Sequence, residues 1–224
     1  MTELDDLRYP IGRFALPASS TPELRKAHMQ TLSQLPERLW SAVAALNETQ
    51  LNTPYREDGW TVRQVVHHIA DSHAQAYIRC KTALTEDWPT VKVYDEAAWA
   101  KLPDSRLPVG GSLALIEALH GRWVALLEAL TDEDFRKGFV HPERGRIDLA
   151  EVLAMYAWHS LHHTAHITGL RAHGLVETAW SPALRQLLLS GWPRQSNSIS
   201  PTIPQPLCWR MAACSSTCAL PATQ

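Results

Sequence analysis

The sequence lacks the features of a secreted or membrane-spanning protein. Only four of its 224 residues are cysteine, and just one of them, Cys80, precedes the C-terminal tail, so no evenly spaced disulfide framework is present. No 18 apolar residues follow one another, and the first 20 residues have neither the basic nor the apolar region of a signal peptide. We therefore expect a cytoplasmic protein without a membrane span.

Charge of one sign is also absent. The chain has 21 Lys and Arg against 23 Asp and Glu, a net charge of −2, and no basic run is interleaved with aromatic residues. A nucleic-acid partner is therefore not expected. Hydrophobic residues make up 45% of the chain, which is enough for one substantial core.

The C-terminal part differs in composition from the rest. After about residue 180 it is rich in Ser, Pro and Thr and has no sustained apolar period. The Cys214 and Cys218 pair has no matching second pair, which disfavours a metal site there. We predict a folded domain over residues 1–178 and a disordered extension over 179–224.

Four segments have apolar residues three or four positions apart, and each begins with a helix-start signal. The predicted starts are the N-cap Thr21 with Pro22 behind it, the capping box Thr61/Gln64, the N-cap Ser112, and a start near Asp148 for a helix ending at Gly174. Pro36 predicts a kink in the first helix. No alternating strand pattern of comparable strength is present, so the predicted fold is an all-α four-helix bundle.

The connection between the second and third helices, residues 85–111, is too long for a tight turn. Such a crossover allows neighbouring helices to run parallel. Its aromatic residues, among them Trp88, Tyr94 and Trp99, either roof one end of the bundle or only seal the core.

Histidines are concentrated on two of the predicted helices. The segment AWHSLHHTAHITGL (157–170) contains four, and the second helix adds His67, His68 and His73. Two imidazoles four positions apart project from one side of a helix, and a third from a facing helix completes a three-ligand metal site. The alternative is a set of hydrogen-bonded core or surface histidines. A metalloprotease is disfavoured, because His163 occupies the position where the H-E-x-x-H motif needs its glutamate.

The last helix offers two pairs with this spacing, His159/His163 and His162/His166. On a helical wheel, His163 and then His159 lie nearest the centre of the apolar face, which favours them as inward-facing. The wheel alone does not choose the pair.

Several segments together resemble the DinB-like superfamily, in its YfiT-type branch of metal-dependent hydrolases. They are YPIG, TPYREDGWTVRQVVHHIADSH, YDEAAW, GSLALIEALHGRW, FVHPE and WHSLHHTAHITGL, and the similarity spans residues 7–174. It implies a four-helix bundle that forms a homodimer and binds one divalent ion per subunit, zinc or nickel. By position the implied ligands are His68, His162 and His166, which leaves His159, His163 and His67 to support the ligands or to pack.

Three functions share this predicted site. A metal with an open position activates water for hydrolysis of a small-molecule substrate, or holds a low-molecular-weight thiol as thiolate for a transferase reaction. The third is a metal-binding module without turnover. No general base is assignable: Asp71 either orients His68 or is an ordinary solvated acid. Arg63, Arg122 and Arg171 are candidates to anchor an anionic substrate, although exposed arginines are common on bundles.

Overall fold

The structure is a computed structural model that describes residues 7–172, with side chains to residue 170. Its four long helices are α2 (Pro22–Val43), α4 (Val62–Thr85), α6 (Gly110–Glu128) and α7 (Leu149–Ala172). Shorter elements are α3 (Glu48–Leu51), α5 (Glu96–Trp99), the 3-10 turns η1 (Pro103–Arg106) and η2 (Asp134–Arg136), and strands β1 (Gly138–His141) and β2 (Gly145–Asp148). The predicted extension, the 178/179 boundary and Gly174 lie outside the described residues.

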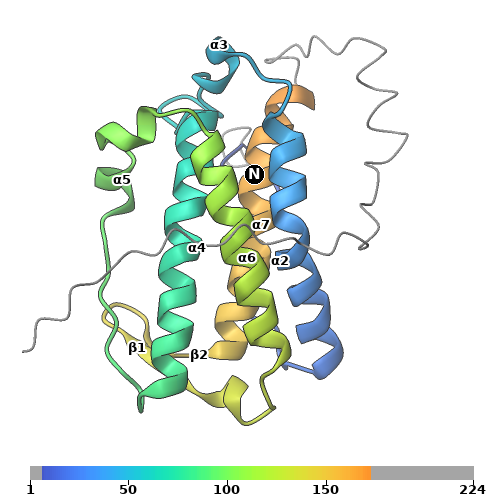
Figure 1. Cartoon of the computed structure of the whole chain (residues 1–224), viewed down its shortest axis with the longest axis vertical. Helices are drawn as coiled ribbons and strands as arrows, with labels where there is room; N and C mark the ends of the chain where they lie inside the picture. The colour runs from blue at the N-terminus through green and yellow to red at the C-terminus, as the bar shows by residue number, and fades with distance from the viewer. Residues whose placement is uncertain (1–6, 173–224) are drawn as a thin grey trace, which may run out of the picture. The chain divides into compact units, whose positions relative to one another are not determined.

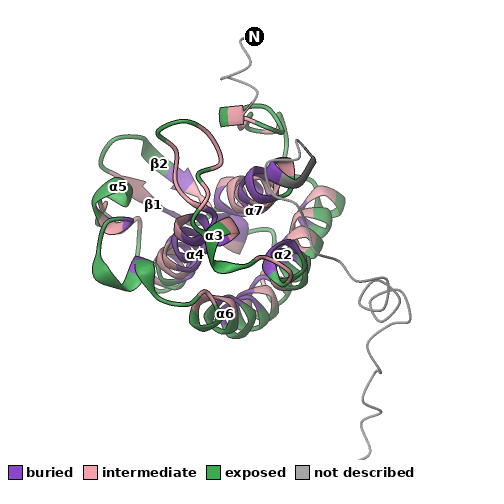
Figure 2. Ribbon diagram, turned by 90° about the horizontal axis from the view of Figure 1, so that it is seen from above, coloured by how far each residue is buried: buried purple, intermediate pink, exposed green. Residues whose placement is uncertain are grey.

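The long helices form the predicted four-helix bundle. Helix α2 packs on α6 and α7, and α4 packs on the same two helices, so that the four surround one core (Figure 2). The crossover that carries α5 and η1 returns the chain to the end of the bundle where α4 began, and α6 then runs parallel to α4 (Figure 1). Among the described residues no helix is long and apolar enough to span a membrane.

The helix starts follow local capping chemistry. The Thr21 side chain accepts a hydrogen bond from the Leu24 amide, and Thr61 and Gln64 form the predicted capping box. Asp148 accepts from the Glu151 amide at the start of α7. The prediction of Ser112 as N-cap is wrong: α6 begins at Gly110 after Val109, with no side-chain cap.

Two further features differ from or extend the sequence expectations. Helix α2 continues through Pro36, so the proline does not end it. An antiparallel hairpin of β1 and β2, not predicted from the sequence, closes the lower end of the bundle in Figure 1. The hairpin requires glycine at 138, because a Cβ there would lie 2.1 Å from the Ile147 carbonyl oxygen.

The hydrophobic core is divided into two clusters along the bundle axis. One contains Trp123 and Leu153 near the hairpin, and the other contains Leu35, Ile69 and Ile167 towards the opposite end. Near the junction of these clusters, α4, α6 and α7 carry buried histidines, among them His73, His120 and His163. A polar layer of imidazoles therefore lies where the apolar core is interrupted.

Candidate metal centre

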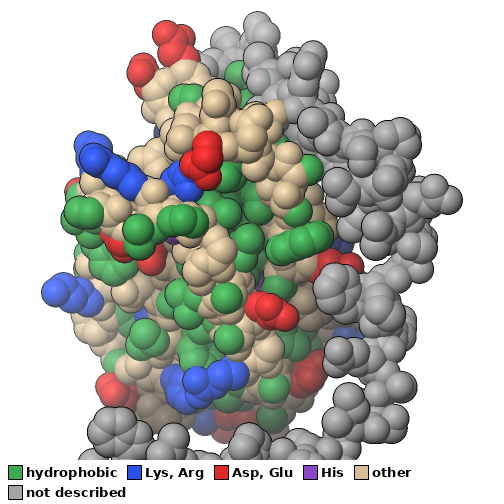
Figure 3. Space-filling view, turned by 45° about the horizontal axis from the view of Figure 1, so that its top comes forward, with side chains coloured by type: hydrophobic (Ala, Val, Ile, Leu, Met, Phe, Trp, Pro, Cys, Tyr) green, Lys and Arg blue, Asp and Glu red, His purple; other side chains and the backbone are tan. Residues whose placement is uncertain are grey.

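Most of the predicted histidines point into the bundle. His68, His162, His163 and His166 are each at most 8% exposed, and His73 is fully buried. His159 is partly buried. Figure 3 accordingly shows almost no histidine surface on the face that it draws. Imidazoles in such surroundings need partners, because an unpaired buried polar group is costly.

One group of histidines joins two helices. His68 of α4 and His159 and His163 of α7 each offer a ring nitrogen, and these nitrogens all lie within 4.8 Å of one another. The Nε2 atoms of His68 and His159 are 3.3 Å apart. Two nitrogens bound at about 2.0–2.1 Å to one tetrahedral ion are about 3.3 Å apart, so the His68 and His159 nitrogens have the separation of two ligands of a zinc-like ion.

A second group lies on α7 alone. It consists of His162, His163 and His166, again with ring nitrogens within 4.8 Å of one another. The His166 Nε2 atom is 3.2 Å from the Arg8 carbonyl oxygen, and its Nδ1 atom is 3.3 Å from His163 Nδ1. The His162 Nδ1 atom is buried without a hydrogen-bond partner.

The predicted ligands are thus divided between the two groups. His68 belongs to the first group, whereas His162 and His166 belong to the second, and His163 is shared by both. His159 and His163, which the helical wheel favoured, are the residues of α7 that lie with His68.

Burial keeps these imidazoles in the form that binds metals. Desolvation lowers the pKa of His68, His162 and His166 to about 4, with the nearby His162 contributing to the shift of the other two. The pKa values of His159 and His163 fall well below the usual range, again mainly because of burial. All five are therefore neutral near pH 7, as metal ligation requires.

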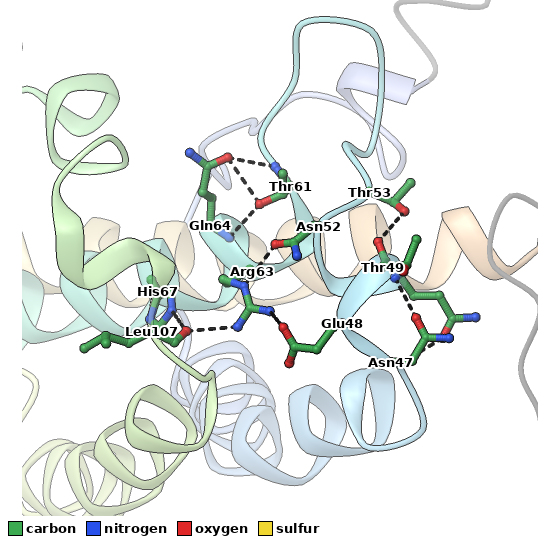
Figure 4. A network of polar contacts seen from close by, with 11 residues as sticks. Asn47, Glu48, Thr49, Asn52, Thr53, Thr61, Arg63, Gln64, His67 and Leu107 are labelled. Atoms are coloured by element: carbon green, nitrogen blue, oxygen red, sulfur yellow. Dashed lines mark hydrogen bonds and ion pairs between the residues drawn. The ribbon is translucent and has the colours of Figure 1, made fainter.

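His67 is engaged elsewhere. Its Nε2 atom donates to the Leu107 carbonyl oxygen at 3.0 Å (Figure 4). Its Nδ1 atom is 2.8 Å from the Ser112 hydroxyl. Both ring nitrogens are therefore used to attach the end of the crossover and the start of α6 to α4. His67 therefore connects three segments of the fold. The Ser112 hydroxyl contacts His67 and does not cap α6.

The structure describes the surroundings of three further candidate residues, Asp71, Arg63 and Arg122. The groups that shift the pKa of Asp71 do not include His68. Burial and then Asp104 raise this pKa, and His67 lowers it. Arg63 is buried, and its guanidinium bonds Asn52, Glu48 and the Leu107 carbonyl, so it connects α4 to α3 and to the crossover (Figure 4). Arg122 lies over the Tyr77 ring, and the Arg171 side chain is outside the described residues.

Sequence reasoning missed a further histidine, His120 of α6. It is 1% exposed, and its Nε2 atom lies 2.9 Å from His73 Nδ1. The Nε2 atom of His73 lies 3.0 Å from His159 Nδ1. His120 is a single histidine in the apolar stripe of α6, and only its spacing within that stripe indicated that it faces inward.

A pocket of about 280 Å³ opens beside the second group. Its lining residues come from the N-terminal segment, the loop before α4, and α7: Arg8, Tyr9, Tyr55, Arg56, Asp58, Gly59, Trp60, His162, His163 and His166. Trp60 also lies 4.6 Å, ring to ring, from His68. The pocket therefore connects an arginine- and aromatic-lined surface to the histidine layer.

The fold and this centre define a class: four-helix bundles with a cluster of metal-competent histidines between their helices. The chain belongs to the DinB superfamily, whose model matches residues 31–167. Proteins from Bacillus cereus (strain 03BB102) and Bacillus thuringiensis subsp. konkukian (strain 97-27), both named "Putative metal-dependent hydrolase", are 54% identical over 168 residues, covering 75% of this chain and 97% of theirs.

A solved structure extends this similarity to three dimensions. YfiT from Bacillus subtilis, described as a probable metal-dependent hydrolase with an unusual four-helix bundle topology, matches with a TM-score of 0.75 and 48% identity. The match covers 77% of this chain and 99% of YfiT. The resemblance seen in the sequence is confirmed.

Proposed function

We propose that this chain is a metal-dependent hydrolase that holds one divalent ion, zinc by preference, between α4 and α7 through His68, His159 and His163. The observation that carries the proposal is the group of three neutral imidazoles on two helices, with the His68 and His159 Nε2 atoms 3.3 Å apart. Three neutral ligands leave the ion its full charge and an open position, which is typical of catalytic zinc sites.

The alternative ligand set is the one implied by the family resemblance, His68, His162 and His166. The unpartnered Nδ1 atom of His162 favours it. The Arg8 carbonyl oxygen can only accept, so His166 donates to it from Nε2, which leaves its Nδ1 atom unprotonated and available to an ion. The ring of His166 stacks on Tyr55, with ring centroids 4.0 Å apart. His162 and His166 also line the pocket, and the zinc content of His159→Ala and His162→Ala separates the two ligand sets.

When bound, the metal supplies a Lewis acid that activates water at neutral pH. The chain's own residues then bind and orient the substrate. Trp60 contacts His68 and covers the histidine layer on the pocket side, where it limits access of bulk water. His163 lines the pocket and belongs to both histidine groups, so a substrate in the pocket lies next to the proposed ion.

The pocket favours a small substrate with a negatively charged group. Arg8 and Arg56 line it with one carboxylate, that of Asp58, so the arginines outnumber the acid, and Tyr9 and Tyr55 provide flat apolar walls beside them. Guanidinium groups recognise carboxylate and phosphate oxygens in a fork geometry. Among the described residues, Arg8 and Arg56 are therefore the candidates for substrate anchoring.

The experiment that tests this function compares two substrate panels on the zinc-loaded protein. Turnover of anionic esters or amides that stops on chelation and returns with zinc supports the hydrolase. Turnover only with a low-molecular-weight thiol and an electrophile assigns the transferase instead. Loss of the helical circular dichroism signal on chelation, with no turnover in either panel, assigns a structural metal module and overturns the proposal.

Assembly and location complete the proposal. By the family resemblance we propose a homodimer, and from the sequence a cytoplasmic location. Sedimentation equilibrium of the full-length protein should give twice the chain mass, and a monomer mass would contradict the dimer.

A further inference from the structure

Residues 7–14, where the described part of the chain begins, are attached to the last helix of the bundle. They lie beside α7 on the side away from α6 (Figure 2). His166 Nε2 donates to the Arg8 carbonyl oxygen at 3.2 Å, and the Trp158 indole N–H donates to the Gly12 carbonyl oxygen at 3.3 Å. These partners are 158 and 146 positions apart in the sequence, so the segment is held by the fold and not by its own neighbours.

A tight turn shapes the middle of this segment. The Gly12 amide donates to the Tyr9 carbonyl oxygen at 2.8 Å, and Pro10 occupies the second position of the turn, where proline is favoured. Gly12 has a φ of +79°, which residues with a Cβ rarely adopt. The turn therefore depends on glycine at its last position, and it brings Arg13 back towards Tyr9.

The Tyr9 ring is held in place by Arg13. Arg13 Nη1 donates to the Tyr9 hydroxyl at 3.0 Å, and the Arg13 Cζ atom lies 4.0 Å from the centroid of the ring. A guanidinium over an aromatic ring is attracted by the negative potential of the ring face. Arg13 is exposed and is not among the residues that line the pocket, whereas Tyr9 is. Arg13 therefore fixes a residue of the pocket wall from outside the pocket.

Tyr9 supplies the aromatic surface that residues 7–14 contribute to the pocket. The segment lines the pocket with Arg8 and Tyr9. The Tyr9 ring is half-buried and lies 6.1 Å, centroid to centroid, from the ring of His162. Because the pocket has a volume of only about 280 Å³, the loss of one aromatic ring from its wall changes the size of the molecule that fits. Tyr9 can be replaced without removing a histidine or an arginine from the pocket.

We propose that Tyr9 is a specificity-determining residue that limits the size of the substrate next to its anionic group, and that Arg13 and Trp158 are positioning residues for it. The inference rests on the proposed function in one respect, that the pocket holds a small anionic substrate. It does not depend on which three histidines bind the metal. A wall rejects larger molecules only if it does not yield, and the contacts of the segment with α7 and of Arg13 with Tyr9 provide this rigidity.

The test compares carboxylates of increasing size on the zinc-loaded, full-length protein. The probes are acetate, benzoate and 2-naphthoate, and ligand-observed NMR titration gives the dissociation constant of each. We expect the parent protein to bind benzoate more tightly than 2-naphthoate, although the larger ring system would gain more from burial in an open site. Tyr9→Ala should raise the affinity for 2-naphthoate by about 10-fold or more, and the affinity for acetate should stay near the parent value.

Two sets of control variants separate the wall from general effects on the segment. Ile11→Ala is the matched control, because Ile11 belongs to the same turn, is 42% exposed and is not among the residues that line the pocket. It should leave all three affinities unchanged. Arg13→Met should raise the affinity for 2-naphthoate less than Tyr9→Ala does, and Arg13→Lys, which keeps a cation for the ring face, should restore the preference for benzoate. Should Tyr9→Ala lose the helical circular dichroism signal, Tyr9→Val replaces it, since it also removes the ring.

Zinc content is measured on the same samples, so the outcomes separate the two proposals. If the parent protein holds zinc and Tyr9→Ala changes the three affinities by one common factor, or not at all, the size limit is refuted and the metal site stands. A zinc-loaded parent protein that binds 2-naphthoate as tightly as benzoate, or that binds none of the three carboxylates, also refutes the size limit. A parent protein that binds no zinc contradicts the proposed function itself.

Discussion

Acid should destabilise the metal-free protein far more steeply than its near-neutral net charge suggests. Four buried histidines, His68, His120, His162 and His166, have pKa values lowered to about 4, mainly by desolvation. In the unfolded chain the same groups titrate near about 6.5. Between these values the unfolded chain binds more protons than the folded one, so the free energy of unfolding decreases as the pH falls.

The magnitude follows from the size of these shifts. A histidine whose pKa falls from about 6.5 to about 4 on folding loses about 2 kcal/mol of stabilisation between pH 7 and pH 5. Four of them lose about 7 kcal/mol, which is comparable with the whole stability of a typical domain, about 5–15 kcal/mol. The stabilisation is complete above about pH 6.5 and is lost as the pH falls towards 4.

Urea unfolding of the chelator-treated protein at intervals between pH 7.5 and pH 5 measures this effect. We expect the unfolding midpoint to fall steeply below about pH 6.5, with an uptake of several protons per molecule unfolded. Zinc should steepen the dependence, because protons compete with the ion for the imidazoles. A midpoint that is flat or rises between pH 7 and pH 5 would refute the buried, neutral histidine layer.

Two further predictions concern packing. Leu35→Ala should lower the free energy of unfolding by about 2–5 kcal/mol, because Leu35 is 1% exposed in the core, whereas Leu16→Ala, at a position 57% exposed, should change it by less than about 0.5 kcal/mol. Gly138→Ala should destabilise the hairpin, since its Cβ would meet the Ile147 carbonyl oxygen at 2.1 Å, while Gly121→Ala, in open space on α6, should stabilise the helix by up to about 1 kcal/mol. Chemical denaturation of the four variants checks both, and equal effects within either pair would contradict the packing described.

The bundle was predictable because its signals are local. Thr21 and Thr61 cap helices through residues three positions away, and apolar residues spaced by one turn define the buried faces. The hairpin escaped prediction because each strand has only four residues, which is too short for a period. Ser112 was misassigned because its hydroxyl is used by His67, 45 residues away in the sequence.

The candidate site was only partly predictable, because it depends on contacts between residues far apart in the sequence. The sequence located the histidine-rich helices and the inward side of α7, but the facing residue on α4 depends on how two helices pack. His120 contacts Leu32 across 88 positions, and Arg8 contacts His166 across 158. Such contacts leave no local pattern in the sequence.

The most direct test of the proposed centre is the zinc content of single alanine variants, purified at saturating zinc, with the helical circular dichroism signal as the control for folding. The proposal predicts one equivalent of zinc in His162→Ala and trace zinc in His159→Ala, because only the latter loses a ligand of the His68, His159 and His163 group. Zinc retained in His159→Ala and lost from His162→Ala would contradict it and assign the ligands to His68, His162 and His166.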